Sequence, residues 1–228
     1  MNQQEMKEEN KKTLFSEILS NPGISRIKLA KKCSYSKTTV SILVDELIKE
    51  GYVEDGGPAA SAGHTQGRRP TSLFPNTRKY TVLIVNWDKK YVQLARADLA
   101  TDVSSIREIS IAETADPQNE LFSCLEQYIR QECGGIYVLA VCWILPAMID
   151  REHDCLISDV LEKKMTIHFF EHAEHRFPYI RHFYFNDTAC LAYAEKVHGQ
   201  TSNEDFVYVN MNDGIGATFV LNGNLLGG

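Results

Sequence analysis

The chain has 228 residues, of which 43% are hydrophobic and 24% are charged, and its formal net charge is −6. This length and apolar content allow one large domain or two smaller ones with a buried core, and they exclude a disordered chain. The charge is uneven, because residues 1–80 hold 13 Lys and Arg against 9 Asp and Glu, whereas residues 81–228 hold 11 against 21. Only the first part is therefore suited to bind a polyanion such as nucleic acid.

Cysteine usage and hydropathy indicate the cellular compartment. The six cysteines are scattered without a Cys-x-x-Cys pair, and residues 1–12 are polar and charged. We therefore expect reduced thiols and a cytoplasmic location. The longest apolar stretch, residues 136–149, is shorter than the roughly 18 to 20 residues of a membrane helix, so we expect no membrane partner.

The first predicted element is a helix at residues 6–20, where apolar side chains recur at helical spacing. Asn21, Pro22 and Gly23 follow it as a stop signal. This helix would support the segment that comes next.

Residues 25–51 carry the pattern of a helix-turn-helix. Two apolar sets at helical spacing, one before and one after a break at residues 33–35, predict two short helices joined by a tight turn. Ser36 is expected to cap the second helix, and Gly51 is expected to end it in the left-handed conformation.

Small hydroxyl side chains and one cation stand at the front of the second helix. A major groove accepts such groups from an exposed helix. We therefore predict DNA contacts from Ser36, Lys37, Thr38, Thr39 and Ser41. The alternative is an ordinary pair of helices with a solvated polar face.

Two short strands are predicted after this helix, at residues 52–57 and 72–74, and they would form a wing. The loop between them ends in Gly67-Arg68-Arg69-Pro70. Arg68 and Arg69 are expected to enter a narrow minor groove, where the negative potential favours guanidinium groups. The alternative is a basic linker between domains.

From Tyr80 the pattern changes to strand-rich α/β. Three strands in succession indicate an antiparallel meander, at residues 80–86, 91–99 and 106–112. Helices and strands then alternate, with helices predicted at residues 118–133, 162–176 and 189–198, strands at residues 135–145 and 183–185, and a closing hairpin at residues 205–228. This order is compatible with a ribonuclease H-like lobe.

A histidine-rich segment within the predicted helix 162–176 suggests a metal site. His168, Glu171, His172 and His175 would share one face of that helix. No second element in the sequence supplies a further ligand. We therefore interpret the face as solvated and expect no metal.

Taken together, the segments resemble the ROK family of bacterial transcriptional repressors and sugar kinases, and within it the branch of xylose-type and N-acetylglucosamine-type repressors. The resemblance rests on blocks in family order from about Leu14 to Gly228, namely SKTTVSILVDELIKEGYV, GRRP, ARADLATDV, ILPAMIDREHDCLIS, FYFNDTACLAYAE and FVYVNMNDGIGATFVLNGNLLGG. It implies an α/β chain with an N-terminal winged helix-turn-helix and an actin-like ATPase (ribonuclease H-like) sugar-kinase fold.

The expected domains follow from this resemblance. They are a winged helix-turn-helix at residues 1–66, a linker at residues 67–79, the first lobe at residues 80–204 and the start of the second lobe at residues 205–228. The family's Gly-Glu-x-Gly-His motif and the cysteine cluster of its structural zinc would follow Gly228, so we expect the second lobe to be largely missing and this chain to hold no zinc or other cofactor.

The resemblance also implies a sugar site at Asn186 and Asp187, where the matching aspartate of kinase members is the general base. The residues alone would suggest a helix cap for the same pair. Gly214 and Gly216 match the family's second phosphate segment, which we interpret as vestigial. Ala147 replaces a family glycine at the rim of the sugar pocket.

The first phosphate loop of the family's kinases is not retained. That glycine-rich loop, with an Asp, two Gly and a Thr, is replaced by residues 85–90, where Trp87 and Lys89 are expected to obstruct a phosphate. We therefore expect no catalytic residue, with Asp187 acting as a base only if the chain is a kinase.

The favoured hypothesis is a repressor of carbohydrate genes, such as those of xylose metabolism, that binds double-stranded operator DNA as a homodimer and senses a sugar or sugar phosphate. Two alternatives stay open, a ROK-type sugar kinase with a DNA-binding head and a constitutive DNA-binding fragment without an inducer response. The sequence specifies neither the inducer nor the operator.

Overall fold

The computed structural model describes residues 2–58, 71–88, 90–111, 116–158, 161, 165–199, 204–211 and 214–226. The chain forms two compact units. The first comprises Met1–Thr81, Asp98–Asp102 and Gly135–Tyr137, and the second comprises Val82–Ala97, Val103–Gly134 and Val138–Gly228. Each unit has its own hydrophobic core.

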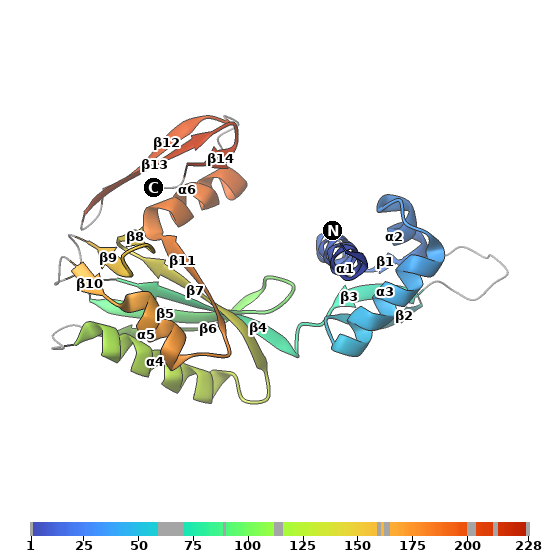
Figure 1. Cartoon of the computed structure of the whole chain (residues 1–228), viewed down its shortest axis with the longest axis horizontal. Helices are drawn as coiled ribbons and strands as arrows, with labels where there is room; N and C mark the ends of the chain where they lie inside the picture. The colour runs from blue at the N-terminus through green and yellow to red at the C-terminus, as the bar shows by residue number, and fades with distance from the viewer. Residues whose placement is uncertain are drawn as a thin grey trace. The chain divides into compact units, whose positions relative to one another are not determined.

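The first unit is a winged helix-turn-helix (Figure 1). Its described elements are α1 (Gln3–Ser20), β1 (Ile24–Ser25), α2 (Arg26–Lys32), α3 (Lys37–Glu50), β2 (Val53–Pro58) and β3 (Thr71–Pro75). The strands form an antiparallel sheet in the order β1-β3-β2. The predicted helices and wing strands are thus confirmed, but two residues are too few to show alternation, so the sequence does not predict β1.

The core of the first unit follows from helical spacing. On α3 the buried residues recur every three or four positions, as one face of a helix requires. They pack with apolar residues of the other elements to form one cluster, made of Leu14, Ile18, Ile24, Leu29, Ala30, Val40, Leu43, Val44, Leu47, Val53 and Leu73. The second helix of the helix-turn-helix, α3, which we call the recognition helix, is therefore held by its apolar stripe. Its opposite face is turned away from the core.

The second unit is built on a five-stranded sheet in the order β11-β7-β4-β5-β6. Its strands are β4 (Tyr80–Trp87), β5 (Tyr91–Ala97), β6 (Val103–Ser110), β7 (Tyr137–Leu145) and β11 (Arg181–Asn186). The predicted meander is confirmed, because β5 pairs antiparallel with both β4 and β6. Strand β11 runs parallel to β7, so both deliver their carboxyl ends to the same edge.

Helices α4 (Pro117–Glu132) and α5 (Phe169–Arg176) lie together on one side of this sheet (Figure 1). Aromatic residues fill the layer between helices and sheet. The ring of Phe169 lies 5.5 Å from that of Phe122, 5.7 Å from that of Trp143 and 5.8 Å from that of Trp87. Among the described helices, none is both long and apolar enough to cross a membrane.

A small antiparallel sheet corrects one prediction. It consists of β8 (Met148–Asp150), β9 (Cys155–Ile157) and β10 (Met165–Ile167). The helix predicted at residues 162–176 is wrong in its first part, because β10 pairs with β9 and the helix begins only at Phe169. Between them His168 adopts a left-handed conformation with φ 58°, which breaks the backbone before the helix.

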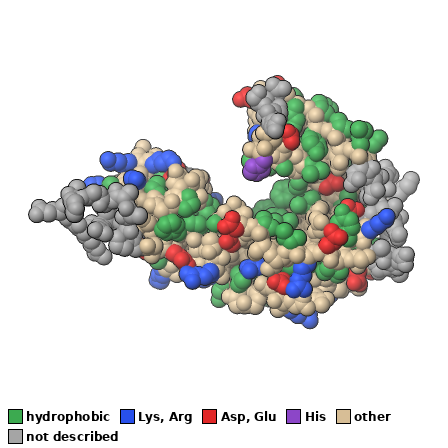
Figure 2. Space-filling view, turned by 180° about the vertical axis from the view of Figure 1, so that it is seen from behind, with side chains coloured by type: hydrophobic (Ala, Val, Ile, Leu, Met, Phe, Trp, Pro, Cys, Tyr) green, Lys and Arg blue, Asp and Glu red, His purple; other side chains and the backbone are tan. Residues whose placement is uncertain are grey.

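The last elements are α6 (Asp187–His198) and a sheet of β12 (Phe206–Met211), β13 (Ile215–Leu221) and β14 (Asn224–Leu225). Gly216, which was matched to the second phosphate segment, lies inside β13. The outward face of β12 and β13 carries exposed apolar side chains, namely Val207, Val209, Met211, Ile215, Phe219 and Leu221. Figure 2 shows hydrophobic side chains gathered on this part of the second unit.

Candidate functional site

The front of the recognition helix has the predicted cap. The Ser36 hydroxyl accepts a hydrogen bond from the backbone N–H of Thr39 at 3.0 Å and lies 2.8 Å from the Thr39 hydroxyl. Lys37 and Thr38 are exposed beside them, and Gly51 ends the helix at φ 85°. A helix N-terminus that carries hydroxyl side chains and one exposed ammonium group suits both phosphates and base edges.

Ser41 has a second partner that the sequence does not reveal. Arg26 of α2 donates to the Ser41 carbonyl at 3.3 Å and to its hydroxyl at 3.4 Å, and also pairs with the Asp45 carboxylate at 2.7 Å. These contacts fix α2 against α3. Ser41 is therefore partly engaged within the helix-turn-helix, whereas the other predicted DNA contacts on α3 are not held in this way.

The basic residues of the first unit differ in their surroundings. Lys28 and Lys31 on α2 are exposed, whereas the Lys32 ammonium pairs with Glu17 of α1. Arg68 and Arg69, predicted to reach the minor groove, lie outside the described residues. Their role stays a prediction from the sequence.

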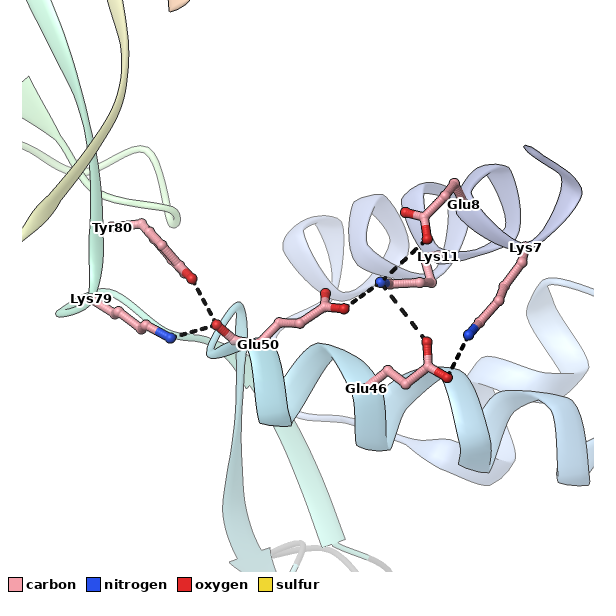
Figure 3. Close-up of polar contacts among 7 residues, drawn as sticks. All are labelled: Lys7, Glu8, Lys11, Glu46, Glu50, Lys79 and Tyr80. Atoms are coloured by element: carbon pink, nitrogen blue, oxygen red, sulfur yellow. Dashed lines mark hydrogen bonds and ion pairs between the residues drawn. The ribbon is translucent and has the colours of Figure 1, made fainter. Parts of the chain in front are cut away.

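A buried lysine joins α1 to the far end of α3 (Figure 3). The Lys11 ammonium lies 2.6 Å from Glu50, 3.7 Å from Glu8 and 3.9 Å from Glu46. Burial lowers the pKa of Lys11, but the hydrogen bond to Glu50 and the three carboxylate charges outweigh it, so this pKa is raised. The charged form is thus stabilised, and α1 is fixed to α3.

The backbone carbonyl of Glu50 receives two further donors at the same place (Figure 3). The Lys79 ammonium donates at 2.6 Å and the Tyr80 hydroxyl at 2.7 Å. The Tyr80 ring also stacks on Tyr52, with ring centroids 4.7 Å apart. A carbonyl left free at a helix C-terminus is therefore satisfied by residues that follow the wing.

The second unit contains a cavity of about 490 Å³ at the carboxyl ends of β7 and β11. It gathers residues from segments far apart in the sequence, including Asn86, Asp88, Pro146, Ala147, Ser158, Asn186, Asp187, Thr188, Gly214 and Gly216. The structure thus brings the predicted sugar pair and the predicted phosphate glycines to one cavity. Clefts of this size at strand ends are where small ligands bind.

Asn186 is the N-cap of α6, as its residue type alone predicts. Its side-chain oxygen accepts from the Ala189 N–H at 3.1 Å, and its amide nitrogen donates to the Ala147 carbonyl at 3.0 Å. The Ser158 hydroxyl holds the neighbouring Pro146 carbonyl at 2.5 Å. Asn186 therefore shapes one wall of the cavity.

Asp187 presents a carboxylate to the cavity. One of its oxygens accepts from the Thr188 N–H at 2.6 Å and from the Thr188 hydroxyl at 3.2 Å. Both of these hydrogen bonds use the Oδ1 atom, and Asp187 lines the cavity. A carboxylate oriented in this way can accept hydrogen bonds from sugar hydroxyls.

Gly216 is explained by packing. A Cβ atom at this position would lie 2.3 Å from the Thr188 hydroxyl oxygen and 3.2 Å from the Thr188 Cβ. Thr188 is itself buried. The glycine therefore lets β13 approach the start of α6, whether or not a phosphate binds there.

The first phosphate segment requires a correction. Trp87 is only 3% exposed and its ring stacks on Phe169, so its side chain packs in the core, although the residue also lines the cavity. The reason is strand alternation, which points Trp87 to the same side as Val85. A tight hairpin occupies the place instead, since the Asp88 N–H donates to the Tyr91 carbonyl at 2.9 Å. Lys89 lies outside the described residues.

The predicted histidine face is also corrected. His168 precedes α5. Among the described residues, one group of three possible metal ligands has its ligand atoms within 4.8 Å of one another, namely Asp154, His168 and Glu171, without His172 or His175. Asp154 accepts from two backbone N–H groups at the start of α5, so it caps that helix. The positive end of a helix disfavours a cation, and we assign Asp154 to capping of α5.

Two family profiles match the chain, winged helix-turn-helix DNA-binding at residues 7–54 and ROK family at residues 91–228. The xylose repressor of Bacillus subtilis (strain 168) is 27% identical over 241 residues, which cover 98% of this chain and 58% of that protein. The chain thus spans less than two thirds of the length of this curated relative.

Solved structures of ROK family proteins are also similar to this chain. A ROK family transcriptional regulator, a homolog of the E. coli MLC protein, matches with a TM-score of 0.74 and 22% identity over 97% of this chain and 56% of its own. A ROK family glucokinase from Streptomyces griseus, in complex with glucose and AMPPNP, matches with a TM-score of 0.53 and 15% identity over 65% of this chain and 46% of its own. At these identities the likeness shows the fold, and the predicted fold class is confirmed.

The predicted family is confirmed as well. The ROK profile alone covers more than half of the chain, and the winged-helix profile covers the predicted helix-turn-helix. The similarity to xylose repressors agrees with the predicted branch. The chain therefore belongs to the ROK family.

Proposed function

We propose that the chain is a transcriptional repressor of carbohydrate genes whose binding to operator DNA is controlled by a sugar, and that it is not a kinase. The observation that carries the proposal is the pairing, on one chain, of an exposed, capped recognition helix with a cavity that presents Asp187. The relatives are named xylose repressors, which makes a pentose such as xylose the first inducer to test. Such a regulator works on the chromosome, in the cytoplasm.

The DNA-binding part of the proposal rests on the front of α3. Lys37, Thr38 and Thr39 face away from the apolar stripe and are not engaged by α2. Double-stranded operator DNA would receive this face in its major groove, and Arg68 and Arg69 would enter the minor groove beside it. One such module reads one half-site, so we propose that the chain acts as a homodimer on a two-fold symmetric operator.

The sensing part rests on the cavity. Asp187 would accept sugar hydroxyls, while Asn186 is committed to its cap and to the Ala147 carbonyl and would hold the cavity wall in place. Gly214 and Gly216 line the same cavity, but Gly216 is explained by its close approach to Thr188. We propose that no cofactor or zinc is needed for sugar recognition by these residues.

Residues 85–90, which stand in place of the first phosphate loop of the kinases, support the proposal that the chain is not a kinase. A phosphate loop needs backbone N–H groups that point at the ligand. Here the Asp88 N–H is used within the β4–β5 hairpin. Asp187 would therefore bind a sugar without activating it toward a phosphoryl donor.

The test begins with an operator selected from random duplex DNA by the purified chain. We expect sequence-specific binding in a fluorescence anisotropy titration, and we expect Lys37→Ala with Thr39→Ala to weaken it by about tenfold or more, because a phosphate contact and base-edge contacts are lost. Lys49→Ala is the matched control, since Lys49 is exposed in the last turn of the same helix. Selection of no preferred sequence would contradict the proposal.

The same protein distinguishes a sugar-responsive repressor from a constitutive DNA-binding protein and from a kinase. We expect D-xylose or another sugar of a panel to weaken operator binding and to raise the melting temperature, and Asp187→Asn to reduce both effects. An unchanged operator affinity across the panel would favour a constitutive DNA-binding protein. Sugar-dependent ATP consumption that Asp187→Asn abolishes would establish the kinase alternative.

A further inference from the structure

The recognition helix carries one apolar side chain on its otherwise polar face. Ile42 is 54% exposed, although it lies on the helix that the proposed function places in the major groove. It follows Thr38 by four residues, so the two side chains lie one above the other on the same side of α3. A single exposed isoleucine elsewhere on a surface would be ordinary.

Two neighbours of Ile42 on this face, Ser41 and Asp45, are already engaged. Arg26 binds the hydroxyl of Ser41 and pairs with the carboxylate of Asp45 at 2.7 Å. The exposed side chains in the first half of α3 are Lys37, Thr38 and Ile42, and Arg26 engages none of them. These three side chains offer a ligand one ammonium group, one hydroxyl and one branched apolar group.

A major groove offers one apolar group to such a side chain, the C5 methyl of thymine. Cytosine presents an amino donor at the neighbouring position, and an isoleucine would bury that donor without a partner. We infer that Ile42 is a specificity-determining residue, which selects a thymine in each operator half-site by contact with its C5 methyl group. This inference rests on the proposed function and adds the base that α3 recognises.

Uracil lacks only the methyl group of thymine, so it isolates the contact. We replace each thymine of the selected operator in turn by deoxyuridine. We expect binding of the full chain to weaken about fourfold at one position in each half-site, because the burial of one methyl group is lost. Cytosine at this position should weaken binding further, and 5-methylcytosine should restore part of the loss.

The protein variants test whether Ile42 makes this contact. Ile42→Ala should bind the thymine and uracil operators equally, whereas Ile42→Val should keep part of the difference. Ile27→Ala is the matched control, because Ile27 is 48% exposed in the same unit but lies on α2, and it should discriminate as the unchanged chain does. Because Ile42 is exposed and alanine favours helices, the variant should fold, which circular dichroism checks.

The outcomes separate the two proposals. If the chain binds a specific operator but no uracil substitution changes its affinity, the inference about Ile42 is wrong and the proposed function stands. The same conclusion follows if Ile42→Ala still distinguishes thymine from uracil. If the unchanged chain selects no sequence at all, both the proposed function and this inference are overturned.

Discussion

The two units differ in how far apart along the chain their functional residues lie. In the winged helix, the proposed contacts on α3 and the signals that begin and end this helix all lie between Ser36 and Gly51. In the second unit, the cavity combines the end of β4, the Pro146-Ala147 turn, the start of α6 and residues as late as Gly216. A recognition helix can therefore be inferred from local spacing, whereas a cavity depends on how strands are ordered in a sheet.

An N-cap residue has different consequences in the two units. Ser36 caps α3 through contacts within the next three residues. Asn186 caps α6 with one end of its amide and holds the Ala147 carbonyl with the other. A polar residue before a helix is readable as a cap in both cases, but only the fold shows that one of them also shapes a cavity.

The largest effect is expected where β13 approaches the start of α6. Gly216→Ala should destabilise this unit by roughly 1–3 kcal/mol, because the new methyl group overpacks against Thr188. Urea unfolding followed by tryptophan fluorescence measures the change, since Trp87 and Trp143 both lie in the core of this unit. The winged-helix unit should keep its stability.

A glycine without close neighbours provides the control. A Cβ atom at Gly134 would meet nothing within 4 Å, so Gly134→Ala should be close to neutral. Thr188→Ala combined with Gly216→Ala should recover part of the loss, because the obstructing hydroxyl is gone. Equal stability of the Gly216→Ala and Gly134→Ala variants would show that Gly216 is not required for packing.

Local signals predicted much of the fold and part of the site. Spacing and caps gave α1, α3, the meander and the N-caps at Ser36 and Asn186, because each depends on residues within one or two turns. The ion pair between Arg26 and Asp45 escaped prediction, since it joins two helices whose angle is a tertiary property. The sequence pattern places the Trp87 side chain in the loop after β4. Strand alternation instead points it toward the core, on the same side as Val85.

The segment before α5 shows the limit of periodicity. The spacing of His168 and its neighbours is helical, yet strand pairing of β10 with β9 overrides it and His168 turns left-handed. Asp154 then reaches the start of α5 from another element. Neither contact leaves a signal in the sequence of the helix itself.

A smaller effect is expected from the paired caps. Ser36→Ala should cost about 1 kcal/mol in the stability of the first unit, because one N-cap bond is lost. Asn186→Ala should cost about 2 kcal/mol in the second, because a cap and the bond to Ala147 are lost together. Chemical denaturation of each variant, with unit-specific probes, measures the difference.

An isosteric variant divides the two roles of Asn186. Asn186→Asp keeps an oxygen for the Ala189 N–H but removes the donor to the Ala147 carbonyl. It should therefore retain the cap and lose sugar-induced stabilisation, if Ala147 holds the cavity wall. A variant that binds sugar as the unchanged chain does would show that this bond does not shape the cavity.

The smallest effect is expected at the C-terminal end of α3, where residues outside the helix donate hydrogen bonds to its last carbonyl. The Glu50 carbonyl at the end of α3 accepts from both Lys79 and Tyr80, so either donor can partly replace the other. Tyr80→Phe should cost only about 0.5 kcal/mol in the stability of the winged-helix unit, and Lys79→Met a similar amount. The double variant should cost more than the sum of the single ones, because it leaves the partly buried carbonyl without either donor.

Thermal unfolding of the four proteins in this cycle measures the coupling, and Tyr137→Phe is the matched control. Tyr137 contacts the Tyr80 ring, with centroids 5.9 Å apart, and its own ring is retained in the variant. Additive effects of Tyr80→Phe and Lys79→Met would show that the two donors act independently. A coupling would show that Lys79 and Tyr80 hold the end of α3 jointly, which the sequence of α3 alone does not predict.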